Sequence, residues 1–401
     1  MKNKHVPWAS FLVCYLAYTS IYVSRVNLSM ANSALIEGGF LAASQIGALG
    51  TVFSVVYAGG RLFNSALADR IMPWILIVSG LAAAGLSNVL AGFLPVFLLM
   101  ALLWGVNAYG QSMLWSSILR IIAATYDGPT AKRRTAVMVS TVGTGNLAAI
   151  LLNTWLIEAF GLRYAFFVPG IINLLLAPAV YFTNRFVPFQ GKPKGEPVWR
   201  SFRLLLHPEV RPMLVPALCH GVLKDNISLW MAVYFVSFFG IDLKQSAYFV
   251  LLIPSVGLVG RLLYNLVYRL MKERENLVSL AGFGVCVLAS AILLFKKVHP
   301  LTAAICLSLI YAAISLINTS FLSVGPLKFT KTGDTGAVSG IMDLLTYLGA
   351  GIGSAVYGVI IEAMGNDGYI VMFASWVALS LLSAFLMARL CRKEKRTETE
   401  R

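Results

Sequence analysis

The chain has 401 residues, of which 58% are apolar and only 12% are charged, and its formal net charge is +15. Its mean hydropathy is +0.77, and a chain of this length cannot hide so much apolar surface in a soluble core. The composition therefore excludes an ordinary soluble protein and predicts that the lipid bilayer is its main partner. A nucleic-acid partner is not expected, because the basic residues are segregated by loop rather than gathered into one patch.

Twelve apolar segments follow one another along the chain, each of about 20 residues or more. In the first half they cover residues 10–32, 44–67, 73–93, 95–122, 134–159 and 163–184. In the second half they cover residues 212–238, 245–268, 276–295, 299–323, 335–361 and 368–389. A helix rises ~1.5 Å per residue, so each segment can cross ~30 Å of hydrocarbon. We therefore predict an all-α membrane protein with twelve transmembrane helices.

The basic residues predict how these helices are oriented. Of the 32 Lys and Arg residues, 23 fall on the termini and on alternate loops, and five lie within apolar segments. The opposite loops hold only Arg163, Lys244, Lys296 and Lys297. By the positive-inside rule, both termini and the central loop face the cytoplasm of a multi-pass protein in the inner (plasma) membrane. The first segment has no A-x-A-like cleavage site, so we expect it to remain as a helix.

The spans divide into two groups of six. Between Asn184 and Arg211 the hydropathy falls and four prolines appear, as is typical of a connector. We expect an N-terminal six-helix half over 1–185, a cytoplasmic linker over 186–211, a C-terminal six-helix half over 212–391 and a basic cytoplasmic tail over 392–401. The tail is most simply an anchor against anionic lipid.

Two short motifs recur in both halves. Arg25-Val-Asn27-Leu-Ser29 returns 199 positions later as Lys224-Asp-Asn226-Ile-Ser228, and Gly60-Arg61-Leu62 returns 200 positions later as Gly260-Arg261-Leu262. Near-equal offsets indicate two pseudo-symmetric halves with the same orientation. In transporters built this way, the substrate site lies near the bilayer midplane at the interface of the repeats.

The repeated motifs place one cation inside each half. A charge at the bilayer centre costs at least ~2.5 to 3.5 kcal/mol, so a charge kept there usually faces a cavity and has a function. Arg25 lies about fifteen residues into its segment, which disfavours snorkelling to the headgroups. Lys224 could bind an anion, or it could form a structural ion pair with Asp225; Asp343, within the eleventh segment, is another carboxylate that could balance it. Arg25 and Lys224 together predict one site for a small anion.

Other polar and aromatic residues could complete or gate that site. Arg61 and Arg261 lie near the cytoplasmic ends of their segments, where snorkelling or gate bridging is as plausible as substrate binding. Arg120 lies near a helix end and could cap or gate it. Several aromatic and amide groups could line a polar pocket: Tyr18, Tyr22, Gln111, Trp115 and Tyr347. Packing is the commoner role for the aromatic residues among them.

The loop between the second and third segments carries a family resemblance. Ser65-Ala-Leu-Ala-Asp69-Arg70 resembles the Gly-x-x-x-Asp-Arg loop of the major facilitator superfamily, with Ser65 in place of glycine. The resemblance implies a major facilitator fold and a gating or coupling role for Asp69 and Arg70.

Within that superfamily, the chain resembles the organophosphate:phosphate antiporters nearly from end to end. Tyr22-Val-Ser-Arg25-Val-Asn27 matches the family's Tyr-x-x-Arg-x-Asn, and the resemblance implies that Arg25 binds the substrate phosphate. Lys224 stands at the place of the family's second phosphate-binding Arg. Three further matches are Arg61 where the family often has Lys, Trp115-Ser-Ser-Ile-Leu-Arg120, which lacks two family prolines, and Gly336-Ala-Val-Ser-Gly340 with Tyr347-Leu-Gly349.

Three departures from the family concern the substrate. Lys224 keeps a charge but lacks the planar fork of an arginine, which can grip two phosphate oxygens at once. The family's histidine in the fifth span falls at Gly145, beside Asn146. The eighth span has no acidic residue, and Asp343 could have taken over its role.

Three functions remain open. The leading expectation is exchange of an organic phosphate for inorganic phosphate, with Asn27 and Asn226 beside the two cations in the site. A cation-coupled symporter of organic carboxylates and a membrane sensor of sugar phosphates are the alternatives. An enzyme is not expected, because no nucleophile, acid-base set or metal cluster stands out among these residues, and no cofactor is expected either. We expect the protein to act as a monomer.

Overall fold

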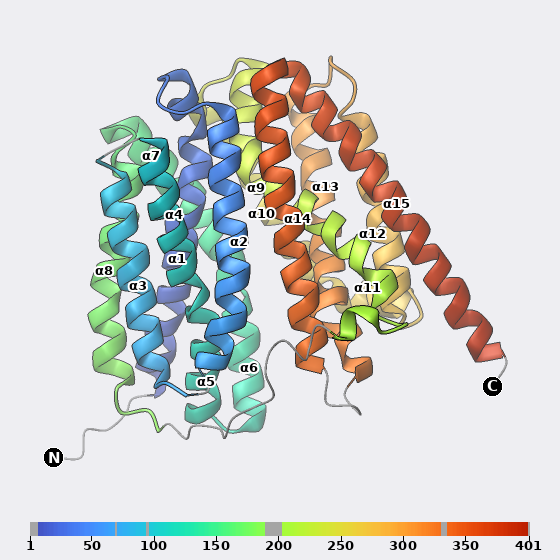
Figure 1. Ribbon diagram of the computed structural model, residues 1–401, viewed down its shortest axis with the longest axis horizontal. Coiled ribbons are helices and arrows are strands. Elements are labelled where there is room, and N and C mark those ends of the chain that lie inside the picture. The colour runs from blue at the N-terminus through green and yellow to red at the C-terminus, as the bar shows by residue number, and fades with distance from the viewer. Residues whose placement is uncertain (1–6, 69, 94–95, 189–202, 330–334, 400–401) are drawn as a thin grey trace. The chain divides into compact units, whose positions relative to one another are not determined.

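The computed structural model describes residues 7–68, 70–93, 96–188, 203–329 and 335–399, and its regular elements are helices (Figure 1). The chain forms two compact units, Met1–Glu196 and Pro197–Arg401. Twelve helical stretches of the described residues are long and apolar enough to cross a membrane. The prediction of an all-α protein with twelve membrane spans is thus confirmed.

Within the described residues, the first unit builds six spans from eight helices. They are α1 (Pro7–Glu37), α2 (Ala43–Leu67), α3 (Pro73–Ala91), α4 (Phe97–Ser112), α5 (Leu114–Thr125), α6 (Gly128–Val139), α7 (Thr141–Phe160) and α8 (Tyr164–Asn184). The fourth span changes helix at Met113 and the fifth at Ser140. The hydropathy pattern did not predict these two breaks.

The second unit follows the same plan. Its elements are η2 (Arg211–Met213), α9 (Leu214–Phe239), α10 (Leu243–Leu262), α11 (Tyr264–Leu270), α12 (Glu275–Ile292), α13 (Pro300–Thr319), η3 (Ser320–Val324), η4 (Gly325–Phe329), α14 (Thr335–Met364) and α15 (Asn366–Thr399). The η3 segment is a π-helical turn that interrupts the tenth span, whose counterpart in the first unit, the fourth span, is interrupted at Met113.

Local sequence signals mark several helix ends. The Asp127 carboxylate accepts a hydrogen bond from the Thr130 backbone N–H at 3.3 Å and so caps α6. Asp242 caps α10 in the same way, through the Gln245 N–H at 2.6 Å. Both satisfy backbone donors that have no partner inside the helix. Gly240 ends α9 in the left-handed conformation, with φ of 66°, which glycine adopts without a steric penalty.

Helix pairing repeats from one unit to the other. In the first unit α1 packs on α7, α2 on α4 and α3 on α8. In the second unit α9 packs on α14, α10 on α13 and α12 on α15. In each unit the first span therefore pairs with the fifth, the second with the fourth and the third with the sixth. This equivalence supports the internal repeat inferred from the two sequence motifs.

The repeated glycines lie at equivalent helix contacts. A Cβ on Gly60 of α2 would overlap the Ser112 hydroxyl of α4, and a Cβ on Gly260 of α10 would lie 3.0 Å from the Ala312 Cβ of α13. In both units the glycine lets the second span approach the fourth. The following residue, Arg61 or Arg261, is thereby carried on a closely packed helix.

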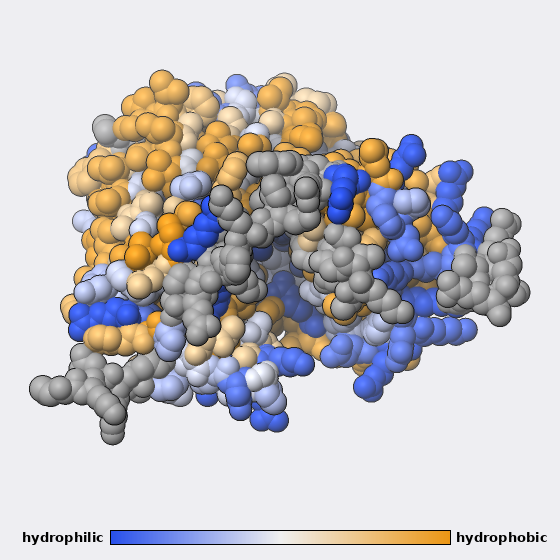
Figure 2. All heavy atoms as spheres, turned by 60° about the horizontal axis from the view of Figure 1, so that its bottom comes forward, coloured by the Kyte–Doolittle hydropathy of each residue, from blue (hydrophilic) through white to orange (hydrophobic). Residues whose placement is uncertain are grey.

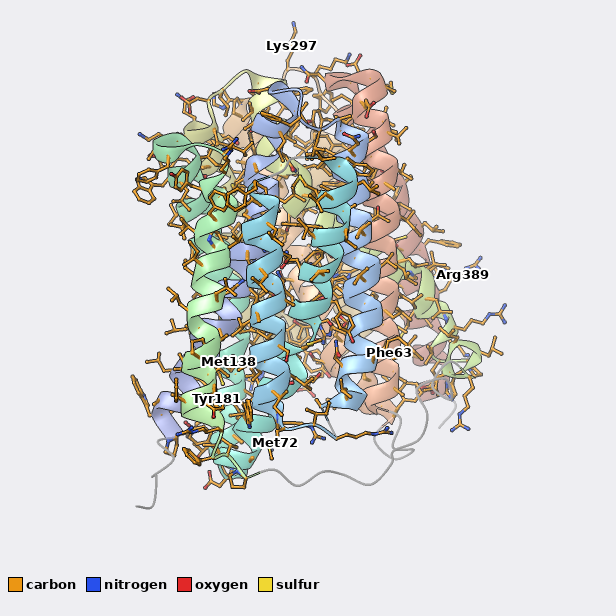
Figure 3. All side chains as sticks on the ribbon, turned by 60° about the vertical axis from the view of Figure 1, so that its left-hand side comes forward. Phe63, Met72, Met138, Tyr181, Lys297 and Arg389 are labelled. Carbon is orange, nitrogen blue, oxygen red and sulfur yellow. The ribbon has the colours of Figure 1, made fainter. Side chains whose placement is uncertain are left out.

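Large apolar side chains remain exposed along the outer faces of the spans. Phe63 is 72% exposed and Leu98 is 78% exposed, and Figure 3 shows Phe63 pointing away from α2. Figure 2 shows broad apolar areas on the surface, with hydrophilic residues gathered toward its lower edge and right-hand side. Such surfaces are stable in lipid and would be aggregation-prone in water.

The segment that precedes α9 belongs to the second unit. Leu204 and Val210 are buried there in a cluster with Phe283, Phe321 and Phe329. The predicted linker over 186–211 therefore ends in residues that pack as core, while its residues 189–202 lie outside the described part of the chain. The predicted tail begins within α15, which runs to Thr399 as one helix.

One ion-pair cluster joins three spans of the second unit. The Lys328 ammonium lies 2.5 Å from a carboxylate oxygen of Glu275 and 2.7 Å from one of Glu394. The Asn276 amide also donates to Glu394, at 2.7 Å. Since these residues lie on η4, α12 and α15, the cluster ties the ends of the ninth, tenth and twelfth spans together.

Candidate functional site

Arg25 lies against two aromatic rings of the neighbouring helix α2. Its guanidinium carbon is 4.5 Å from the ring centroid of Phe53 and 5.3 Å from that of Tyr57. Arg61 approaches the same Tyr57 ring, with its guanidinium carbon 5.9 Å from the centroid. Both cations are half-buried, and the ring faces attract their charge. The first unit thus places two guanidinium groups around one tyrosine.

The turn of α1 just before Arg25 accepts hydrogen bonds from three side-chain amides. Asn107 of α4 donates to the Ser24 carbonyl oxygen at 3.1 Å. Asn153 of α7 donates to the Val23 carbonyl oxygen at 3.1 Å, and Asn173 of α8 donates to the Ser24 hydroxyl at 2.8 Å. Sequence reasoning missed all three asparagines, because none belongs to a recognisable motif.

Asn27, predicted to line the site, is fully buried among helices. Its amide nitrogen donates to Asn88 at 2.8 Å and to the Ala165 carbonyl oxygen at 2.9 Å. These bonds tie α1 to α3 and α8, which is a packing role. Substrate contact by Asn27 stays a prediction.

The predicted aromatic residues of the first unit lie together. Tyr18 packs between the other two, with ring centroids 5.7 Å from Tyr22 and 5.0 Å from Trp115. Gln111 is buried, and its amide donates to Asn107 at 2.9 Å. Gln111 therefore contacts α1 indirectly, through the same Asn107 that bonds to the Ser24 carbonyl.

Gly145 lies where α7 meets α1. A Cβ at this position would lie 2.7 Å from the Tyr22 Cβ and 3.1 Å from the Thr19 carbonyl oxygen. A larger side chain would therefore have to push the two helices apart. This close approach explains why the histidine suggested by the family resemblance does not fit at Gly145.

Lys224 lies between a carboxylate and an aromatic ring of its own unit. Its ammonium nitrogen is 3.8 Å from the nearer Asp225 oxygen, and the two side chains are only 24% and 17% exposed. The same nitrogen lies 5.1 Å from the Tyr347 ring centroid on α14. Three predicted site residues are thus neighbours in the structure. The ion pair with Asp225 is present, so both of the roles expected for Lys224 remain open.

The helices that carry Lys224 and Tyr347 are in backbone contact. A Cβ on Gly221 of α9 would overlap the Thr346 carbonyl oxygen, and a Cβ on Gly349 of α14 would overlap the Leu218 carbonyl oxygen. Asn226, another predicted site residue, is fully buried and bonds across the same interface to the Ala350 carbonyl oxygen at 3.4 Å. The glycines thus set the distance between α9 and α14.

His220 is a further buried polar residue, one turn before Lys224, that sequence reasoning missed. Its Nε2 lies 3.2 Å from the Ile314 carbonyl oxygen, which can only accept, so this nitrogen is the donor. Its Nδ1 lies 3.4 Å from the Thr346 hydroxyl. The histidine therefore joins α9 to α13 and α14.

The remaining predicted residues are placed as follows. Asp343 is half-buried on α14, one turn before Tyr347, and Arg120 and Arg261 are half-buried near the ends of α5 and α10. Arg70 is exposed in the turn after α2. Asp69 lies outside the described residues, so its gating role stays a prediction, as do those of the other four.

Two units with the same six-span packing, each with a half-buried cation on its first span, have the architecture of a membrane transporter. The chain belongs to the Major Facilitator Superfamily, whose family model matches residues 14–354. It is therefore a secondary transporter of the major facilitator type.

Several relatives match most of the chain at low identity. The glycerol-3-phosphate transporter of Haemophilus influenzae is 23% identical over 458 residues, covering 96% of this chain and 92% of the relative. The membrane sensor protein UhpC of Salmonella typhimurium is 22% identical over 419 residues, covering 95% and 92%. The probable sulfoacetate transporter SauU of Cupriavidus necator is 27% identical over 387 residues, covering 88% and 87%. The first two support the resemblance to the organophosphate:phosphate antiporter type.

A partial sequence match and a solved structure complete these comparisons. The probable hexose phosphate transport protein of Chlamydia trachomatis is 25% identical over 178 residues, but the match covers 44% of this chain and only 39% of that relative. The structure of the nucleoside transporter NupG is similar with a TM-score of 0.80 at 14% identity, covering 95% of this chain and 99% of that one. At this identity the structural likeness shows the fold alone.

Proposed function

We propose that this transporter exchanges an organic phosphate for inorganic phosphate by alternating access. The observation that carries the proposal is the pair of repeat-related cations, Arg25 on α1 and Lys224 on α9, each half-buried within an apolar span. A phosphate monoester carries about −1.5 to −2 charges near pH 7, so two cations are a fitting complement. The relatives named for glycerol phosphate and hexose phosphate transport support the same substrate class.

The contacts of the two cations suit them to bind phosphate. The Arg25 guanidinium carbon lies close to the ring centroids of both Phe53 and Tyr57, and an arginine can offer two N–H groups to two phosphate oxygens at once. Lys224 supplies a single, more mobile charge over Tyr347. Arg61, which approaches the same Tyr57 ring, adds a second positive charge within the first unit.

Asp225 offers a route to coupling. At 3.8 Å it partly neutralises Lys224 while no anion is bound, and an arriving phosphate would compete for the same ammonium. A carrier whose cations hold no substrate anion should reorient slowly, and a loaded one quickly. Exchange rather than net flux follows, with Asp343, Arg120 and Arg261 proposed as coupling or gating residues.

The test is uptake of radiolabelled phosphate into proteoliposomes loaded with phosphate, followed by competition with phosphate esters and carboxylates. Arg25→Lys should reduce exchange by about tenfold or more, because it keeps the charge but removes the bidentate fork. Lys297→Gln is the control, since Lys297 is exposed and points away from the helices (Figure 3). Exchange at the wild-type rate by folded Arg25→Ala protein would refute the assignment.

Two alternatives follow from the comparisons. One is a cation-coupled symporter of organic carboxylates, and the likeness to SauU, named as a probable sulfoacetate transporter, supports an organic anion other than a phosphate. The other is a membrane sensor of sugar phosphates, which the likeness to the membrane sensor protein UhpC supports. Liposomes with and without internal phosphate, each with and without a pH gradient, separate these functions. Fast uptake without internal phosphate that requires the proton gradient would establish a symporter, and binding without any uptake would establish a sensor. Termini on the cytoplasmic side are part of the proposal, and protease protection of terminal tags in oriented vesicles tests that part.

A further inference from the structure

The three amides that meet α1 come from three different helices and reach the same turn. Asn107, Asn153 and Asn173 lie on α4, α7 and α8, and they donate to the Ser24 carbonyl, the Val23 carbonyl and the Ser24 hydroxyl at 3.1, 3.1 and 2.8 Å. All three side chains are fully buried. The turn they bind ends at the residue that carries the guanidinium, Arg25.

We propose that Asn107, Asn153 and Asn173 are positioning residues that hold Arg25 in the orientation needed to bind the anion. The inference rests on the proposed function, in which Arg25 contacts the substrate phosphate. It adds a role for three residues whose amides bond to the turn of α1 that precedes Arg25.

The geometry of α1 explains how they would act. Successive helix residues are ~100° apart around the axis, so a small rotation of this turn would swing the Arg25 side chain sideways. The guanidinium lies over Phe53 and Tyr57 on α2, whereas the three amides reach α1 from α4, α7 and α8. Bonds from three other helices resist both rotation and sliding of the turn, and they leave Arg25 facing α2.

The amide oxygens of two of these asparagines favour a positioning role over a role in packing alone. Within the described part of the chain, the amide oxygens of Asn153 and Asn173 are buried and accept no hydrogen bond. Burying a polar atom without a partner is unfavourable, so apolar side chains of similar size would pack here at less cost. Amides at these positions are explained if their donors are needed to hold the turn that precedes Arg25.

The mildest test removes one acceptor from α1 and leaves the asparagines in place. Ser24→Ala deletes the hydroxyl that accepts from Asn173, and the matched control is Ser20→Ala, one turn earlier. The Ser20 hydroxyl is also buried, but its bond, to the Ala17 carbonyl oxygen at 2.8 Å, stays within α1. Ser24→Ala should raise KM for phosphate exchange about three- to tenfold with a smaller effect on kcat. Ser20→Ala should leave KM unchanged.

The stronger test deletes the donors in two backgrounds. Asn107→Leu and Asn153→Leu should each raise KM about tenfold in the wild type. In an Arg25→Lys background they should raise it less than twofold, because the fork they position is already gone. Asn184→Leu is the structural control: Asn184 is a buried asparagine of the same unit that bonds to Ser10, near the start of α1. It should lower the melting temperature without changing KM.

The outcomes separate the two levels of the argument. If Arg25→Lys leaves both the exchange rate and KM at their wild-type values, the proposed function is wrong and the positioning role falls with it. If Arg25→Lys raises KM but Ser24→Ala behaves like Ser20→Ala, or the asparagine effects are fully additive with Arg25→Lys, the positioning role is wrong and the proposed function stands. Should the leucine variants fail to fold, the serine pair still decides.

Discussion

Replacing Gly349 by alanine tests how closely α9 and α14 must pack around Lys224. Gly349 lies two residues after Tyr347, whose ring is 5.1 Å from the Lys224 ammonium. A Cβ at Gly349 would overlap the Leu218 carbonyl oxygen and lie 3.0 Å from the Leu218 Cα. Backbone atoms cannot rotate aside as a side chain can, so the two helices would have to separate by about 1 Å.

The magnitude follows from two opposing terms. Overpacking a close contact costs ~1 to 3 kcal/mol, and alanine in place of glycine regains up to ~1 kcal/mol of helix propensity. We therefore expect a net loss of roughly 1 to 2 kcal/mol in the free energy of unfolding. In a unit of this size that lowers the melting temperature by about 2 to 4 °C per kcal/mol. Separation of Lys224 from Tyr347 should also weaken anion binding.

Thermal unfolding of the purified protein and phosphate exchange in proteoliposomes are the assays. Gly340→Ala is the matched control, because Gly340 is on the same helix but a Cβ there meets no atom within 4 Å among the described residues. Its melting temperature should stay the same or rise. If the Gly349 and Gly340 variants have the same melting temperature and exchange phosphate equally well, the close packing of α9 on α14 does not determine the position of Lys224 relative to Tyr347.

Three further predictions concern close contacts and ion pairs. Gly145→Ala should raise KM for phosphate in the exchange assay because it pushes α7 away from α1, and an unchanged KM would argue against this contact. Lys328→Met should lower unfolding stability by about 1 to 3 kcal/mol, since it leaves two carboxylates together; a melting curve like that of the wild type would show that the cluster contributes nothing. Lys224→Met should destabilise the protein more than the double variant Lys224→Met with Asp225→Asn, though neither should transport, and equal melting temperatures would exclude the pair as a stabilising contact.

The membrane spans could be predicted closely because length and hydropathy alone determine them. The fourth span, expected over 95–122, is formed by helices over Phe97–Ser112 and Leu114–Thr125. The change of helix at Met113 and the π-helical turn over Ser320–Val324 could not be predicted. Hydropathy indicates which segments are stable in lipid. It does not indicate which carbonyl accepts each backbone N–H hydrogen bond, and that pattern is what changes at a helix break or a π-helical turn.

The cations of the candidate site could be predicted because charge inside an apolar run is rare and costly. Lys224, Asp225 and Tyr347, each named from the sequence as a candidate residue, are neighbours in the structure, and their part in binding stays a prediction. The rings under Arg25 were not predicted, because 12% of the chain is aromatic and nothing in the sequence singles out Phe53 and Tyr57. A charged residue within an apolar span indicates a site by its position alone, whereas an aromatic residue can be assigned to a site only when its neighbours in the structure are known.

The buried asparagines illustrate what a single sequence leaves hidden. An amide inside an apolar span is neutral, so burying it costs less than burying a charge, and by itself it is weaker evidence of a function. Its meaning depends on its partner, and Asn173 bonds to Ser24 across 149 positions of sequence. Arg25 stands out in the sequence because burying its charge costs much free energy. The amides proposed to hold its helix are neutral, cost less to bury, and lie apart in the sequence on α4, α7 and α8. In such a transporter the buried cation can be identified from the sequence, but the residues that orient its side chain can be identified only from the packing of the helices.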